Sequence, residues 1–159
     1  MHEKLKFEQI KKDSCASLRY DYSSLYPKDE MPLHFHPEIE ICYVVKGSGY
    51  RMMGDFLEPF EEGEVVLVPT NQPHCWMYNP ESCEPDGKRQ CIVVQFNPDL
   101  LQAGLSFFTE WEYAAHRLSA IQQGILLTGR TAGKIKSCLE EMNCLNASER
   151  MLMLIRILQ

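Results

Sequence analysis

Short apolar runs separated by turn residues fill the first two thirds of the chain. Between residues 16 and 96 these runs are ASLRYDY, HFHPEIEICYVV, GYRMM, DFLEPF, EVVLVP, HCWMY and CIVVQF. The segments between them, such as KGSG, PTNQP and NPESCEPDGKR, are rich in the Gly, Pro and Asn residues that favour turns. Many short strands at close spacing are typical of an all-β sandwich or barrel. We therefore predict a β-barrel domain over residues 1–97.

The pattern becomes helical after residue 97. Asn97 suits a helix N-cap, Pro98 the first helical position and Asp99 the positive end of the helix dipole. Further on, apolar residues recur with the period of one helix face, at Ile135, Cys138, Leu139, Met142 and Leu145. Asn146 and Glu149 resemble a capping box that opens a second helix. We predict a helical segment over residues 98–159.

The predicted last helix, residues 148–159, is apolar on most of its sides. Such a helix is usually buried, either on a partner chain or on the chain's own barrel, and apolar residues alone do not choose between the two. Candidate residues for a homodimer contact are Met151, Leu152, Leu154, Ile155 and Leu158. Because no glycine, proline or terminating charge follows, we expect the natural protein to continue beyond residue 159.

The composition and charge of the chain argue against several classes of protein. With 159 residues the chain suits one domain, and its formal net charge of −6 makes it a poor nucleic-acid-binding surface by itself. The charged N-terminus, MHEKLKFEQIKKDS, is unlike a signal peptide, and no apolar stretch reaches the length of a membrane span. We expect a cytoplasmic protein with no membrane contact. Its seven cysteines form no Cys-x-x-Cys pair, so reduced thiols are expected.

Two histidines and a glutamate interrupt an apolar strand. His34, His36 and Glu40 share parity, so an unbroken strand would point all three to one face. His74, on another predicted strand, supplies a further imidazole. Three histidines and a carboxylate suit a divalent transition metal such as Zn, Ni, Fe or Mn. The alternative is a metal-free pocket in which the same groups hydrogen-bond an organic ligand.

Apolar residues around this set indicate a pocket. Trp76 and Tyr78 share parity with His74, while Cys42 and Val44 share parity with Glu40. An aromatic wall beside a few convergent polar groups is how small-molecule sites are usually built, although Trp76 would also suit an ordinary barrel core. We predict that these four residues line an effector pocket.

The spacing of these residues resembles the two motifs of the cupin superfamily. The first reads His34-x-His36, three residues, Glu40, six residues and Gly47; the second runs from Gly63 through PTNQP to His74. The resemblance implies a jelly-roll barrel in which the three histidines and Glu40 hold a metal. The chain departs from the pattern at three turn positions, where glycine or asparagine is replaced by Lys28, Asn71 and Tyr78. Since asparagine tolerates positive φ, Asn71 should preserve its turn.

From about residue 30 to its end, the chain also resembles the N-terminal sensor domain of AraC-type transcription regulators. The phrase that carries this likeness runs from PLHFHPEIEICYVVKGSGY to VLVPTNQPHCW. The resemblance implies a bacterial regulator rather than an enzyme, with a small effector, such as a sugar or related polar metabolite, bound in the barrel. It also implies a homodimer and a helix-turn-helix DNA-binding domain beyond residue 159. The alternative is a metal-dependent cupin dioxygenase or isomerase, for which Tyr78 and His116 are weak candidates for a general base.

Overall fold

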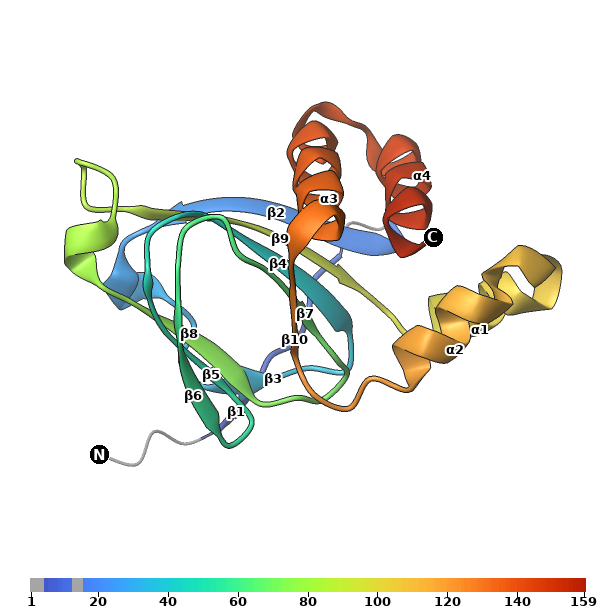
Figure 1. Ribbon diagram of the computed structural model, residues 1–159, viewed down its shortest axis with the longest axis horizontal. Helices are drawn as coiled ribbons and strands as arrows, with labels where there is room; N and C mark the ends of the chain where they lie inside the picture. The colour runs from blue at the N-terminus through green and yellow to red at the C-terminus, as the bar shows by residue number, and fades with distance from the viewer. Residues whose placement is uncertain (1–4, 13–15) are drawn as a thin grey trace.

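A computed structural model describes residues 5–12 and 16–159 and consists of two facing β-sheets followed by helices (Figure 1). Sheet A contains, in spatial order, β1 (Lys6–Phe7), β3 (His34–Phe35), β8 (His74–Tyr78), β5 (Gly49–Met53) and β6 (Phe56–Phe60). Sheet B contains β10 (Ile125–Leu127), β7 (Val65–Val68), β4 (Ile39–Lys46), β9 (Arg89–Phe96) and β2 (Leu18–Leu25). Neighbouring strands are antiparallel except β1 and β3, which are parallel.

Four α-helices follow the last long strand. They are α1 (Asp99–Phe107), α2 (Glu112–Ser119), α3 (Gly129–Glu141) and α4 (Ala147–Leu158). Short 3-10 turns occur at Pro27–Asp29, Pro80–Ser82, Thr109–Trp111 and Met142–Cys144. In Figure 1, α3 and α4 lie on the outer side of the sheet that contains β2, β9 and β4. None of the helices in the described part of the chain combines the length and apolar character needed to cross a bilayer.

Two hydrophobic clusters divide the core. The inner cluster lies between the sheets and includes Val44, Phe60, Val68 and Trp76. The outer cluster lies between sheet B and the helices, and its members include Ile41, Val94, Leu139 and Leu154. The three central strands of sheet B, β4, β7 and β9, are therefore buried on both faces, which explains why they read as nearly continuous apolar runs rather than as alternating ones.

Each predicted apolar run contains strand, but one run was assigned wrongly as a single strand. The run HFHPEIEICYVV divides into β3 in sheet A and β4 in sheet B, with the break at residues 36–38. Pro37 lies in this break, and proline has no N–H to give to a strand ladder. The parity argument that placed His34, His36 and Glu40 on one face of one strand therefore fails. The chain instead crosses from one sheet to the facing sheet.

The helical predictions hold in most places. The outer cluster contains four of the five predicted face residues of the first helix as buried side chains and the fifth, Leu145, as a partly buried one. Asn146 and Glu149 form the predicted capping box at the start of α4. Asn97 accepts a hydrogen bond from the Asp99 amide, although α1 begins at Asp99, one residue later than expected. The segment after residue 97 also contains β10, which the sequence did not predict and which pairs with β7.

The candidate dimerisation residues of α4 differ in exposure within the single chain. Leu154 is fully buried in the outer cluster, and Met151, Ile155 and Leu158 pack partly buried against it. Leu152 faces solvent and is 67% exposed. Most of the apolar surface of α4 is thus used inside the chain, and Leu152 is the candidate that this packing leaves open for a partner.

Candidate metal centre

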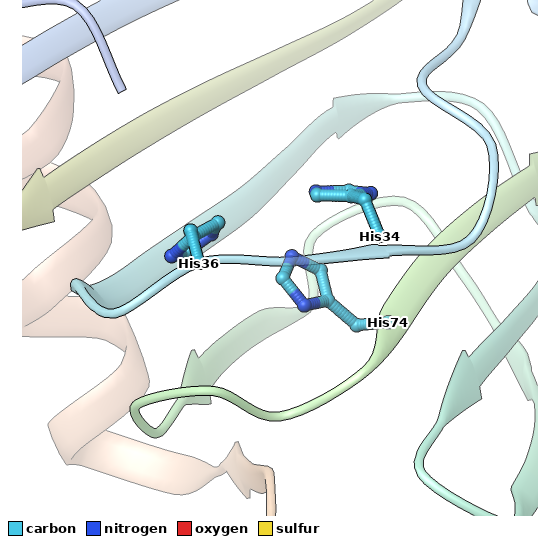
Figure 2. Close-up of side chains that lie close together, drawn as sticks. All are labelled: His34, His36 and His74. Carbon is cyan, nitrogen blue, oxygen red and sulfur yellow. The ribbon is translucent and has the colours of Figure 1, made fainter. Parts of the chain in front are cut away.

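Three histidines from separate parts of the barrel meet in its interior (Figure 2). His34 belongs to β3, His36 to the break after it, and His74 to β8, where it pairs directly with His34. One ring nitrogen of each histidine lies within 4.8 Å of those of the other two, and all three side chains are buried. The amide of Asn71 donates to the His36 carbonyl at 2.8 Å and so ties the turn before His74 to the first motif.

Turn geometry supports this meeting of the two motifs. Asn71 has a φ of 57°, so the prediction that Asn71 preserves this turn in place of glycine is confirmed. Gly47 has a φ of 113°, and a Cβ atom there would lie 2.7 Å from the Tyr78 ring. Glycine at this position therefore makes room for the tyrosine that replaces the expected asparagine.

Each of the three histidines uses Nδ1 in the same way. The Nδ1 atom of His34 lies 2.8 Å from the main-chain carbonyl oxygen of Pro32. The Nδ1 atom of His36 lies 3.1 Å from the main-chain carbonyl oxygen of Glu38, and the Nδ1 atom of His74 lies 2.7 Å from that of Gln72. A carbonyl can only accept, so each Nδ1 must carry a proton. In a neutral ring this leaves Nε2 with the free lone pair that a metal requires.

Glu40 reaches the cluster from the facing sheet. Its Oε2 lies 3.2 Å from Nε2 of His36 and 3.9 Å from Nε2 of His74. Gln95 on β9 donates to the same oxygen at 2.8 Å, and Arg19 on β2 donates to Gln95 at 3.0 Å. A carboxylate that ligates a metal needs hydrogen-bond partners that fix its orientation. Gln95, held by Arg19, is such a partner for Glu40.

Electrostatics divides the cluster into an ion pair and a neutral ring. Burial raises the pKa of Glu40, but the His36 and Gln95 hydrogen bonds outweigh it and lower that pKa to about 2. Burial lowers the pKa of His36, yet the hydrogen bond and charge of Glu40 prevail and raise it above its usual value. Burial lowers the pKa of His74 to about 4, so this ring is neutral near pH 7.

The cluster fits a divalent transition metal. Among the described residues, the buried Nε2 of His74 has no hydrogen-bond partner. A buried lone pair without a donor is costly unless a cation or a ligand satisfies it. Three imidazole nitrogens with one carboxylate suit Zn, Fe, Ni or Mn, as predicted. His34, His36, His74 and Glu40 would hold the ion.

A cavity of about 430 Å³ lies beside this cluster. His34 and Glu40 line it together with three of the four predicted pocket residues, Cys42, Trp76 and Tyr78. The fourth, Val44, is fully buried in the inner cluster and does not line the cavity.

The cavity wall also contains polar residues that the sequence analysis did not select. They are Glu8, Arg19, Asp21, Ser23, Asp29, Glu30, Arg89, Cys91 and Gln95. Cys91, Val93 and Gln95 alternate along β9, so a polar residue at inward parity in CIVVQF was the available signal for Gln95. Glu8 follows β1, and its Oε2 lies 3.5 Å from Nε2 of His34. No sequence signal marked Glu8, because only the parallel pairing of β1 with β3 brings it there.

Residues 22–84 match the sequence model of the cupin domain. The barrel has the cupin jelly-roll fold. The predicted jelly-roll barrel with helices after it is thereby confirmed. The residues of both predicted cupin motifs lie within the matched segment, and so do all four candidate metal ligands.

Several solved structures are similar to part of the chain, with TM-scores between 0.41 and 0.43 for the three described here. A cupin 2 conserved barrel domain protein from Rhodopseudomonas palustris is 15% identical, with a TM-score of 0.43 over 55% of this chain and 57% of its own. A mutant of Bacillus subtilis oxalate decarboxylase is 23% identical, with a TM-score of 0.42 over 52% of this chain and 22% of its own. An RmlC-like cupin from Methanocaldococcus jannaschii is 16% identical, with a TM-score of 0.41 over 57% of this chain and 91% of its own.

The aligned part thus covers less than two thirds of the first two of these proteins. No curated protein sequence matches the chain.

Proposed function

We propose that this chain is the sensor domain of an AraC-type transcription regulator, which binds a divalent metal and a small polar effector in its cupin barrel. The observation that carries the proposal is the set of three histidines, each with Nδ1 at a main-chain carbonyl, beside a cavity of about 430 Å³. A bound metal would supply positive charge and open coordination positions for an oxygen-bearing ligand.

The cavity wall favours a polar effector with both acceptor and donor groups. Trp76 is 8% exposed, and its indole N–H has no hydrogen-bond partner among the described residues. Arg19 offers further N–H donors, and the carboxylates of Glu8 and Asp21 accept. Small-molecule sites of this size commonly combine an aromatic wall with a few polar groups that fix orientation.

Sheet B connects the cavity to the helices. On β4, Glu40 and Cys42 face the cavity, whereas the Tyr43 hydroxyl donates to Glu140 on α3 at 3.1 Å. On β2, the Tyr20 hydroxyl donates to the Leu139 carbonyl of α3 at 3.1 Å. An effector that fits two arrangements of this sheet differently would shift the position of α3 and α4.

Such a shift requires the effector to bind one arrangement of the sheet much more tightly than the other. Converting a mostly inactive population to a mostly active one takes roughly 5.5 kcal/mol of differential binding. Contacts to a desolvated metal and to buried polar groups are strong enough to contribute on this scale. In the regulator, the shift would reposition a dimer, with DNA contact left to a separate domain.

A metal-dependent cupin enzyme is the second candidate. The observation that favours it is that an ion held by His34, His36, His74 and Glu40 would border a cavity large enough for a substrate. Neither candidate base suits the reaction, however. Burial raises the pKa of Tyr78 well above its usual value, which makes it a poor proton acceptor. His116 is exposed on α2 and does not line the cavity.

The test is a thermal-shift screen of polar metabolites against chelator-treated and metal-loaded chain. We expect a hit to stabilise only the metal-loaded form, to change amide hydrogen exchange in α3, and to be recovered unchanged. Trp76→Phe, which keeps an aromatic ring beside His74 but removes the N–H donor, should weaken the hit. Conversion of the hit to a product would favour the enzyme, and unchanged exchange in α3 would contradict the sensor.

The regulator assignment is tested separately by reading the gene beyond codon 159. Two helix-turn-helix motifs and a basic surface are expected there. A stop codon directly after Gln159 would contradict the assignment.

A further inference from the structure

A second set of reactive side chains lines the same cavity around Cys91 on β9. Nη1 of Arg89 donates to the Cys91 sulfur at 2.9 Å, and the Ser23 hydroxyl lies 3.3 Å from that sulfur. The Cys42 thiol on β4 forms a hydrogen bond with the same sulfur. A guanidinium can only donate, so at least one of these contacts places an N–H against the sulfur lone pairs.

The guanidinium of Arg89 is fixed in place from several sides. Nε and Nη2 both donate to Oε2 of Glu30, the former at 2.9 Å. Nη1 also donates to the Ser23 hydroxyl at 2.6 Å, and the guanidinium carbon lies 5.5 Å from the centre of the Tyr78 ring. Arg89 is only 4% exposed. Its charge is therefore held beside Cys91 without a rearrangement of its side chain.

This environment differs from that of an ordinary buried cysteine. Burial in apolar surroundings raises the pKa of a thiol and makes it inert. At Cys91 the hydrogen bond from Cys42 and the charge of Arg89 outweigh burial and lower the pKa, although Glu30 nearby opposes this. Cys91 and Cys42 both line the cavity, so a small molecule that enters it can meet the sulfur.

We propose that Cys91 is a thiolate nucleophile that small hydroperoxides oxidise in the cavity. The Cys91 sulfur attacks one peroxide oxygen, so that an S–O bond forms and the O–O bond breaks. Sulfur loses two electrons and becomes a sulfenic acid, while the peroxide is reduced and leaves as hydroxide or alkoxide, which takes a proton from water. The N–H of Arg89 stabilises the thiolate before the attack and the departing charge during it. The site acts independently of the proposed metal.

The test uses reduced, chelator-treated chain, so that neither a metal nor a pre-existing disulfide takes part. Hydrogen peroxide is added at pH 7 with dimedone, which traps sulfenic acids, and the labelled cysteine is located by peptide mass spectrometry. We expect Cys91 to be labelled before Cys144, although Cys144 is exposed and Cys91 is only 5% exposed. Labelling that follows exposure, with Cys144 first and Cys91 unmodified, would overturn the proposal.

Arginine variants test the activation itself. Arg89→Gln combined with Glu30→Gln removes the guanidinium together with its buried partner, so no charge is left unpaired. We expect oxidation of Cys91 at pH 7 to slow by roughly tenfold and to recover at pH 9, because less of the thiol is ionised at neutral pH. Arg89→Lys keeps the positive charge and is the matched control. Equal rates in all three proteins would overturn the proposal.

If the double variant does not fold, the pH profile of the unmodified chain decides. The rate of iodoacetamide labelling at Cys91 should reach half its maximum at a pH below about 8.5, because about 8.5 is the usual pKa of a free cysteine thiol. A midpoint at or above that value would overturn the proposal.

Discussion

The two faces of sheet B have opposite chemistry although they share the same strands. Towards the helices, β4 presents Ile39, Ile41 and Tyr43 to an apolar cluster that α3 and α4 complete. Towards the barrel interior, it presents Glu40 and Cys42 to a cavity with charged walls. The outer face is packed in an apolar core, whereas the inner face borders a cavity, on whose opposite side the Nε2 of His74 and the indole N–H of Trp76 have no hydrogen-bond partner among the described residues. We therefore expect ligand binding inside the barrel, and we expect the packing between sheet B and the helices to stabilise the fold.

Loss of a histidine ligand should show the difference between the two faces most strongly, because it should abolish metal binding and leave the chain folded. We expect His74→Ala to abolish metal binding, because it removes one of three converging nitrogens, while the apo chain stays folded. The substitution also removes the hydrogen bond that Nδ1 donates to the Gln72 carbonyl and leaves a buried cavity, so we expect the apo chain to lose about 1–3 kcal/mol of stability while it remains folded. Calorimetric titration with metal checks the loss of metal binding, and thermal unfolding of the apo chain checks that the fold is kept. Unaltered metal affinity would remove His74 from the site.

The opposite experiment is made on the outer face. Leu154→Ala should lower the free energy of unfolding by about 2–5 kcal/mol, because Leu154 is fully buried between α4 and the outer cluster. The folded fraction should still bind metal with unchanged stoichiometry. Denaturant unfolding measures the loss, and Leu152→Ala, at an exposed position of the same helix, is the matched control. A loss in Leu152→Ala as large as in Leu154→Ala would show that α4 packs differently.

The support of Glu40 should have an intermediate effect. Gln95→Leu keeps the size of the side chain but removes the hydrogen bond that Gln95 donates to Glu40 at 2.8 Å. We expect metal affinity to fall by roughly 10- to 100-fold, the usual effect of losing an outer partner of a ligand. Titration with metal in competition with a chelator measures it. An affinity within twofold of the unmodified chain would mean that Glu40 does not ligate.

Proton competition gives a smaller, graded effect. The pKa of His36 is raised, so this ring is protonated below that value and must lose its proton to bind a metal. Affinity should therefore rise with pH up to the raised pKa of His36 and become flat above it, with a slope of about tenfold per pH unit below it. His74, whose pKa is about 4, should not contribute between pH 5 and 8. Affinity that is independent of pH over this range would contradict this assignment.

The smallest effect is expected at the contact between sheet B and α3. Tyr43→Phe removes the hydrogen bond to Glu140 and should cost about 0.5–1.5 kcal/mol of stability. Metal affinity should stay the same, but the change in α3 hydrogen exchange on effector binding should shrink. An undiminished exchange response would mean that this bond does not transmit the signal.

The sequence predicted most of the strands, the last two helices and the capping box because each depends on local periodicity or on neighbouring residues; it missed β1 and β10 and joined β3 to β4. It also selected His34, His36, Glu40 and His74, since their spacing within two motifs survives the break at Pro37. Parity along β9 could have marked Gln95 as inward-facing, but its contact with Glu40 and the roles of Glu8 and Arg89 could not be predicted in this way. Each depends on which strand lies beside which, and β1 and β9 reach the site through pairings that no local pattern specifies.

Anomalous diffraction from a crystal of the chain soaked with Mn or Zn would show directly whether the three histidines hold a metal. We expect one strong peak within bonding distance of Nε2 of His34, His36 and His74, with a Glu40 oxygen as the next ligand. A peak elsewhere, or none at saturating metal, would contradict it. The polar interior of the barrel would then have to bind an effector without a metal.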